Sequence, residues 1–282
     1  MKLGIGLPNH IAGVAGGSIA EWARRAEARG FESLATIDRL RYPGLDSLIA
    51  LAAAAGASTD VTLVTNVLLA PVYPVVPLAK EIAGVAQISG GRLVIGLGVG
   101  NRRDDYASTG TDFDRRGKIL DEQVEQLRGL WTDTGTAAVC AAPISVPLLF
   151  GGHSAATVRR VTTVGDGWAA GAVRHYDIQA ELVGRIQDGW VAAGRSGRPY
   201  LQASVNFGMG PEDIVDAGKA HLARYYGFSP EYAQVNIDDM VCSADEARAT
   251  VRRYRDMGFD RLLFHPTTAG LDQLDRLADA IL

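Results

Sequence analysis

Short apolar runs alternate with amphipathic segments along the chain. The runs hold four to nine residues and show no strict alternation of polar and apolar positions, as in strands that are buried on both faces. Most are followed by glycine or by polar residues, which are typical of turns. The eight predicted strands are Leu3–Leu7, Phe31–Ile37, Val61–Leu69, Arg92–Leu97, Pro147–Phe150, Gly167–Ala170, Leu201–Phe207 and Arg261–Phe264.

The segments between these runs repeat apolar residues at helical spacing. Between the first two runs, for example, Ile19, Trp22, Ala23 and Ala26 fall on one helical face. Two segments also carry a Ser-x-x-Glu capping box at their start, Ser18 with Glu21 and Ser243 with Glu246. The chain is therefore predicted to alternate strand and helix.

Eight strands that alternate with helices indicate a (β/α)8 TIM barrel, with residues 1–282 as a single domain. The alternative is an open doubly wound sheet, which usually has a glycine-rich phosphate turn after its first strand. Here that turn is Pro8-Asn9-His10. The segment from Gly208 to Met240 is longer than one crossover helix, and we expect it to be a small insertion that shapes the mouth of the barrel.

Composition excludes several classes of protein. With 28 basic and 32 acidic residues the net charge is -4, so nucleic-acid binding is not expected. Cys140 and Cys242 stand alone and the five histidines lack metal spacing, so neither a disulfide framework nor a metal site is predicted. His175 and His221 are interpreted as surface positions.

No membrane association or export is expected. The most apolar stretch, Asn66 to Ala79, is interrupted by Pro71, Pro74 and Pro77, which a spanning helix would not readily carry. The amino terminus enters an apolar strand directly, without a signal-peptide pattern. These features favour a reduced, cytoplasmic protein.

The carboxyl ends of barrel strands carry the functional groups of TIM barrels. Any single residue there is more often a turn or cap than a ligand, but the set as a whole points to a site. The strand ends supply Asn9, His10, Asp38, Arg39, Asn66, Gly98 to Asn101, Gly151 to Ser154 and His265.

Two glycine-containing segments favour a flat ligand that carries a phosphate. The run Gly96-Leu97-Gly98-Val99-Gly100 lacks the third glycine of a dinucleotide fingerprint and follows the fourth strand, so it is not a Rossmann motif, but it permits close backbone approach. Gly151-Gly152-His153-Ser154 precedes a predicted helix whose free amides suit a phosphate. The alternative is that Ser154 is only an N-cap.

Several motifs together resemble the bacterial luciferase-like monooxygenase family. The most specific part runs from Ser89 to Glu122, including Asp105-Tyr106-Ala107-Ser108-Thr109-Gly110. Gly151 to Ser154 with Gly165-Asp166-Gly167-Trp168 resembles the family's later phosphate and barrel motif, and Asp38-Arg39 and Thr65 to Leu68 match its second and third strand ends.

The resemblance implies a luciferase-like barrel that binds FMN, or its deazaflavin analogue coenzyme F-420, at the carboxyl ends of the strands. It assigns cofactor binding to Asp38, Asn66, Val67, Gly98, Val99, Gly100, Asn101, Gly151, Gly152, His153 and Ser154. It also implies a non-proline cis peptide between Asn66 and Val67. The chain departs from hydride-transferring members, which resemble it but have His and an acid where this chain has Arg39 and Asn101.

The sequence thus predicts a flavin-dependent monooxygenase that uses reduced FMN and oxygen on a small organic substrate. The catalytic candidates are Arg39, His265 and His10. The alternatives are a coenzyme F-420-dependent hydride-transfer enzyme and a non-catalytic flavin-binding barrel. We also expect a separate flavin or deazaflavin reductase as a partner, and a homodimer.

Overall fold

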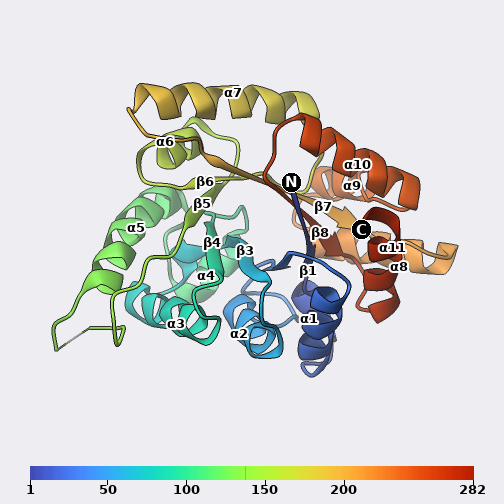
Figure 1. Cartoon of the computed structure of the whole chain (residues 1–282), viewed down its shortest axis with the longest axis horizontal. Helices are drawn as coiled ribbons and strands as arrows, with labels where there is room; N and C mark the ends of the chain where they lie inside the picture. The colour runs from blue at the N-terminus through green and yellow to red at the C-terminus, as the bar shows by residue number, and fades with distance from the viewer. Residues whose placement is uncertain (137) are drawn as a thin grey trace.

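The computed structural model describes residues 1–136 and 138–282. Its parallel strands follow one another in chain order around a closed barrel, and the last strand pairs with the first (Figure 1). The predicted barrel is confirmed, and the open-sheet alternative is excluded. The strands are β1 (Lys2–Gly6), β2 (Ser33–Thr36), β3 (Thr62–Leu68), β4 (Leu93–Leu97), β5 (Leu148–Gly151), β6 (Gly167–Ala169), β7 (Tyr200–Phe207) and β8 (Arg261–Pro266).

Helices surround the barrel (Figure 1). The α-helices are α1 (Ser18–Ala28), α2 (Ser47–Ala57), α3 (Val75–Ile88), α4 (Arg103–Thr109), α5 (Arg116–Thr132), α6 (Ala155–Thr163), α7 (Tyr176–Ala192), α8 (Glu212–Tyr225), α9 (Pro230–Asp238), α10 (Ala244–Asp256) and α11 (Leu271–Ile281). Short 3-10 turns lie at η1 (Pro8–His10), η2 (Ala70–Val72) and η3 (Phe113–Arg115). In the described part of the chain, no helix is both long enough and apolar enough to cross a membrane.

Two apolar layers hold the barrel together. The larger lies between strands and helices, where Trp22 and Trp168 are fully buried. The smaller lies inside the barrel, where Ala35, Val64 and Leu263 pack together from β2, β3 and β8. Because the strands are covered outside by helices and filled inside by side chains, their apolar runs need no alternation.

The two predicted capping boxes behave differently. At α10 the predicted N-cap is confirmed, because Ser243 Oγ accepts from Glu246 N at 3.2 Å. The return bond differs: Glu246 Oε2 accepts from Cys242 N, one residue before the cap, at 2.8 Å. The prediction for Ser18 and Glu21 is wrong, because α1 begins at Ser18 itself and Ser18 Oγ donates to Ala15 O at 2.7 Å. A hydroxyl that engages the preceding turn no longer serves the helix amides.

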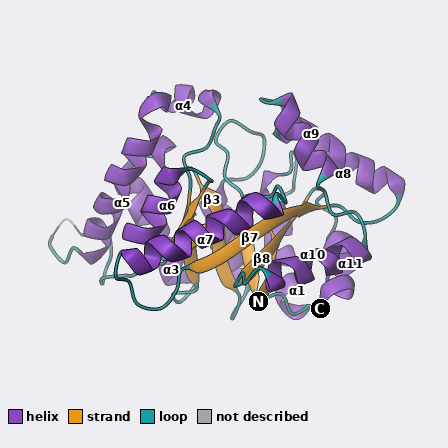
Figure 2. Ribbon diagram, turned by 90° about the horizontal axis from the view of Figure 1, so that it is seen from above, coloured by secondary structure: helices purple, strands orange, loops and turns teal. Residues whose placement is uncertain are grey.

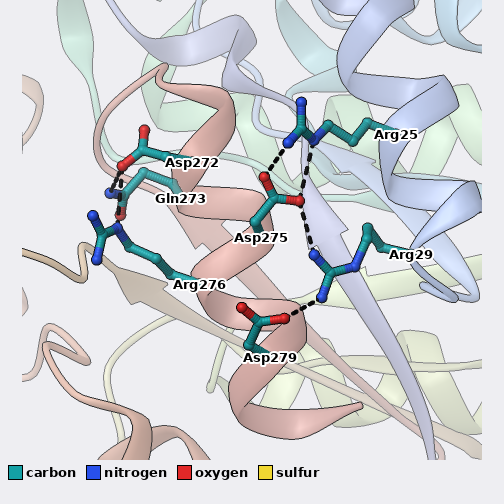
Figure 3. Close-up of polar contacts among 7 residues, drawn as sticks. All are labelled: Arg25, Arg29, Asp272, Gln273, Asp275, Arg276 and Asp279. Carbon is teal, nitrogen blue, oxygen red and sulfur yellow. Dashed lines mark hydrogen bonds and ion pairs between the residues drawn. The ribbon is translucent and has the colours of Figure 1, made fainter.

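The first and last helices meet through charged side chains (Figure 3). Asp275 of α11 lies between Arg25 and Arg29 of α1, and its Oδ1 accepts from Arg25 Nε at 3.1 Å and Arg29 Nη1 at 2.9 Å. Arg29 also pairs with Asp279. These contacts close the ring of helices where the ends of the chain come together.

The segment from Gly208 to Met240 forms α8 and α9, which confirms the predicted insertion. Both helices lie with α4 at the end of the barrel away from the two termini (Figure 2). Asn206 Nδ2 of β7 donates to Asn236 Oδ1 of α9 at 3.1 Å, and Asn236 Nδ2 donates to Tyr232 O at 2.8 Å. The insertion is therefore attached to a strand end and stands over the barrel mouth.

Candidate active site

A cavity of about 270 Å³ opens at the carboxyl ends of the strands, at the lower end of the range for small-molecule sites. One group of lining residues is small and comes from strand ends: Gly100, Gly151, Gly152, Ala169, Ala170, Gly171 and Ala172. A second group is aromatic and comes from the insertion: Tyr225, Tyr226, Phe228 and Tyr232. The remaining lining residues are Ile37, Asp38, Asn66, Val67, Leu69, Asn101, Arg102, His153, Ser204 and His265.

The end of β3 has the predicted irregularity. The peptide between Asn66 and Val67 is cis, as the resemblance implies, and the pairing of β3 with β4 shifts between Thr65 and Leu68. Val67 lines the cavity, and glycines make room for its side chain. A Cβ on Gly98 would lie 2.4 Å from Val67 Cγ2, and one on Gly151 would lie 3.0 Å from Val67 Cγ1.

Asp38 lines the cavity but is already engaged by its neighbours. It is 6% exposed, its Oδ2 accepts from Leu69 N at 2.9 Å, and its Oδ1 accepts from Tyr73 Oη at 2.9 Å. Burial raises the pKa of Asp38 to about 7. The carboxyl therefore holds the turn after β3 in place through these two hydrogen bonds.

Arg39, predicted to be catalytic, is absent from the cavity lining. Its Nη1 donates to Tyr225 O at 2.9 Å, and its guanidinium lies 4.4 Å from the ring centroid of Tyr42. Arg102, which does line the cavity, donates to the same Tyr225 carbonyl at 3.1 Å. Both cations hold the carboxyl end of α8, where unpaired carbonyls favour positive charge.

Three histidines gather beneath the insertion. His265 lines the cavity, whereas His10 lies behind it, with ring centroids 6.0 Å from His265 and 5.3 Å from His221. Burial lowers the pKa of His265 to about 3 and of His221 to about 4, and it keeps that of His10 well below 6.5. The interpretation of His221 as a surface residue is wrong, because it is 3% exposed on the inner face of α8.

The glycine segments contribute only part of what the sequence predicts. Gly100 and Asn101 line the cavity, whereas Gly98 and Val99 do not. Gly151, Gly152 and His153 also line it. Ser154 does not, and it acts as the N-cap of α6 by accepting from Thr157 N at 3.3 Å.

Sequence reasoning missed Arg102 and the chain of small residues from Ala169 to Ala172. The signal in the sequence is the predicted sixth strand, Gly167–Ala170, which is followed by Gly171 and Ala172. Tyr225, Tyr226 and Tyr232 lie in the predicted insertion, but nothing in the sequence assigns them to the lining. Within residues 1–136 and 138–282, no group of three or more His, Cys, Asp or Glu is arranged to hold a metal ion.

Comparison with known proteins identifies the family. The model of the luciferase-like monooxygenase family matches residues 1–258. The chain belongs to this family. An uncharacterised protein of Mycobacterium tuberculosis, Rv0953c, is 32% identical over 225 residues, which cover 74% of each chain. The F420-dependent glucose-6-phosphate dehydrogenase of Kribbella flavida is 26% identical over 226 residues, covering 70% of this chain and 67% of that one.

Solved structures of luciferase-like proteins share the fold. An F420-dependent secondary alcohol dehydrogenase, in complex with an F420-acetone adduct, superposes with a TM-score of 0.82 at 19% identity and covers 100% of this chain and 98% of that chain. The oxygenating constituent of 3,6-diketocamphane monooxygenase from Pseudomonas putida, in complex with FMN, has a TM-score of 0.72 at 13% identity, with coverage of 100% and 99%. Proteins with this fold thus include one described as F420-dependent and one in complex with FMN. Members of the luciferase-like monooxygenase family are oxidoreductases.

Proposed function

We propose that this chain is a monooxygenase that binds reduced FMN in the cavity and oxygenates a small, uncharged organic substrate. The observation that carries the proposal is the chemistry of the lining. Small and aromatic residues dominate it, Asp38 accepts two hydrogen bonds, and burial lowers the pKa of both lining histidines, His153 and His265. Arg102, the cation of the lining, lies over the Phe228 ring. Such a lining excludes water from the reacting atoms.

The residues fit a flat cofactor with a phosphate. Gly100 and Gly152 have φ of 63° and 109°, and their lack of side chains lets a ring system approach the backbone. The turn from Gly151 to His153 leads directly into α6, whose first amides can bind a phosphate. A bound reduced flavin supplies the electrons that activate dioxygen.

The aromatic group of the insertion supports a neutral, planar substrate. Tyr225 is 6% exposed, while Phe228 and Tyr232 are 42% and 39% exposed at the mouth. Arg102, which precedes α4, contributes a positive charge beside these rings, and its guanidinium lies 4.7 Å from the ring centroid of Phe228. Stacking on these rings stabilises flat, apolar molecules.

Coenzyme F-420-dependent hydride transfer is the second candidate. It is favoured by the relative named as an F420-dependent glucose-6-phosphate dehydrogenase and by the structure named as an F420-dependent alcohol dehydrogenase. Oxidation of an alcohol by hydride transfer also removes the hydroxyl proton, which requires a base. Asp38 already accepts two hydrogen bonds, and His265, whose pKa burial lowers to about 3, is a weak base for that step.

Anaerobic titration with FMN and coenzyme F-420, each oxidised and reduced, tests the proposal. We expect tight binding of reduced FMN and, after admission of oxygen, substrate-dependent oxygen uptake. Tight binding of F-420 alone, with no oxygen uptake, would establish the second candidate. Binding of FMN without turnover of any planar substrate would favour a flavin-binding barrel.

A pair of glycine variants tests the site itself. Gly98→Ala should weaken cofactor binding at least tenfold, because the new Cβ would displace Val67. Gly84→Ala in α3 is the matched control, since no other atom lies within 4 Å of its Cβ position. Equal affinities in the two variants would remove Val67 from the cofactor site.

We also propose that a separate reductase supplies the reduced flavin. Turnover should then depend on an added NADH-dependent flavin reductase and should persist when a dialysis membrane separates the two proteins. Turnover by the isolated chain with NADH and oxidised FMN would contradict this proposal.

A further inference from the structure

A line of hydrogen bonds crosses the interior of the barrel and ends at the cavity. Arg261 Nη1 donates to Gln202 Oε1 at 3.1 Å, and Gln202 Nε2 donates to Asn66 Oδ1 at 2.8 Å. Asn66 Nδ2 then lies 3.1 Å from His265 Nε2. We call these four side chains the interior relay.

The barrel geometry places the relay. Gln202 of β7 pairs directly with Arg261 of β8, and His265 lies four residues further along β8. Leu263, between Arg261 and His265, packs inside the barrel with Ala35 and Val64, so alternate residues of β8 face inward. Gln202 and His265 are 0% exposed and Arg261 is 3% exposed. The relay thus connects the base of the barrel to the cavity floor.

Arg261, at the start of the relay, fixes the direction of every hydrogen bond in it. Arginine can only donate, so the atom of Gln202 that faces it must be the carbonyl oxygen. The amide nitrogen of Gln202 then faces Asn66 and must meet an oxygen. This orientation turns the amide nitrogen of Asn66 toward His265, whose Nε2 must accept.

We propose that Arg261 is a positioning residue that, through Gln202 and Asn66, fixes neutral His265 with its proton on Nδ1 and its Nε2 occupied as an acceptor. The relay is present in the free protein, whichever cofactor the cavity binds. Arg261 itself lies outside the cavity lining.

The surroundings of Arg261 support this role. Among the residues that the structure describes, Gln202 is its recorded hydrogen-bond partner and no carboxylate lies within ion-pair distance. Its guanidinium lies 5.2 Å from the ring centroid of Tyr200. Glu32 and Asp260 favour its charge from a distance but form no ion pair with it among the described residues. A buried cation without such a pair is costly, so a purely structural role would be better served by an apolar residue.

The relay changes the interpretation of His265. Burial lowers its pKa to about 3, so the ring is neutral near pH 7. With Nε2 occupied by Asn66, the ring is not free to take a proton from a ligand through that atom. His265 then contributes a fixed, neutral surface to the cavity floor, and it keeps the amide of Asn66 in one orientation.

The test is the tautomer of His265, measured by long-range proton–nitrogen NMR on full-length protein labelled with 15N-histidine. A His265→Phe variant assigns its signals among the five histidines. At pH 7.5 we expect Nδ1 to resonate as the protonated nitrogen and Nε2 as the unprotonated one. The opposite pattern in the unsubstituted protein would overturn the proposal.

Variants of the relay should change this pattern in defined ways. In Asn66→Asp the carboxylate still accepts from Gln202. It cannot donate to His265, so His265 must donate to it and the ring proton should move to Nε2. Arg261→Met removes the fixed donor, so at least a tenth of the population should adopt the other tautomer. Arg261→Lys, which also only donates, should preserve the original pattern.

A matched control separates these effects from general perturbation. Gln179 is also 0% exposed, and its Nε2 donates to Val173 O at 3.0 Å outside the relay. Gln179→Glu should leave the His265 tautomer unchanged. An unchanged tautomer in both Asn66→Asp and Arg261→Met, in protein with native circular dichroism, would show that Arg261 does not set it. If Arg261→Met fails to fold, Gln202→Glu decides the question: its carboxylate accepts from Arg261 and can only accept from Asn66, so the Asn66 oxygen should face His265 and the proton should move to Nε2. An unchanged tautomer in Gln202→Glu would overturn the relay.

Discussion

Polar residues at the strand ends act in two ways that look alike in the sequence. Asp38 and Asn66 line the cavity, yet Asp38 also accepts two hydrogen bonds from the turn after β3 and Asn66 joins β3 to β7 and β8. Arg39, one residue away, faces α8 instead. Asp38 and Arg39 both lie in the loop after β2, so the direction in which each side chain leaves that loop decides whether it meets a ligand or a neighbouring element.

Asp38→Asn should change how stability depends on pH. The pKa of Asp38 is about 7 in the folded protein and near 3.8 in the unfolded chain. The stability that its protonated form contributes is therefore fully present below about pH 4 and is lost as pH rises through 7. Asparagine still accepts from Leu69 N and carries no charge. We expect the variant to gain stability relative to the parent between pH 5 and 8, by up to about 4 kcal/mol.

Urea unfolding at pH 5 and pH 8 measures this gain. The buried histidines act with the opposite sign, because their lowered pKa values remove stability as pH falls. The difference between variant and parent is therefore the readout. Asp112→Asn, at the exposed N-cap of η3, is the control and should follow the parent at both pH values. If the gain from Asp38→Asn is equal at pH 5 and 8, burial of its charge is not the cause.

At the scale of elements, two arginines hold the carboxyl end of α8 to the barrel. Arg39 and Arg102, from the ends of β2 and β4, both donate to the last carbonyl of α8. That carbonyl belongs to Tyr225. The side chains of Tyr225 and Tyr226 line the cavity. The position of the aromatic group therefore depends on two arginines, only one of which reaches the cavity.

Arg39→Met should loosen α8 and α9 without removing a group from the cavity lining. A hydrogen bond from a charged donor contributes about 1.5 to 3 kcal/mol, so amide hydrogen exchange in residues 222–240 should be roughly tenfold faster or more. Turnover should fall while cofactor affinity is retained.

The control for this experiment is Arg103→Met, because Arg103 is 70% exposed and contacts exposed Asp114 and the Phe113 ring, away from α8. The double variant Arg39→Met with Arg102→Met should be more harmful than the sum of the single variants, since either arginine alone still donates to the shared acceptor. Loss of cofactor affinity in Arg39→Met alone would place Arg39 in the cofactor shell.

The sequence predicts elements better than it predicts contacts between them. Apolar runs such as Val61–Leu69 mark the strands because parallel strands are buried on both faces. The family motifs likewise place Val67, Gly100 and Gly152 in the cavity. Distance along the chain hides the rest, since Gln202 meets Asn66 across 136 residues and Arg39 meets Tyr225 across 186. No local pattern specifies such pairs.

At the scale of the whole molecule, a barrel built in chain order must still join its last unit to its first. The pairing of β8 with β1 closes the strands, and the contacts of Asp275 with Arg25 and Arg29 close the ring of helices (Figure 3). These charges lie at the surface, so their individual contributions are small. They nevertheless connect residues about 250 positions apart, as the pair of Arg25 with Asp275 shows.

Asp275→Asn should lower the thermal unfolding midpoint at pH 7 by at most a few degrees, and the loss should disappear at low pH. Its hydrogen bond with Arg25 keeps the pKa of Asp275 below the ordinary value of 3.8, so the stabilisation is present above about pH 4 and is lost as pH falls through the folded-state pKa. Calorimetry at pH 7 and pH 3, with and without 1 M salt, measures both effects, because salt screens exposed charges. Asp272→Asn on the same helix is the matched control: Asp272 pairs with Arg276 one turn away and joins no other helix. If Asp272→Asn lowers the midpoint as much as Asp275→Asn does, the charges on α11 stabilise that helix and not the closure of the ring.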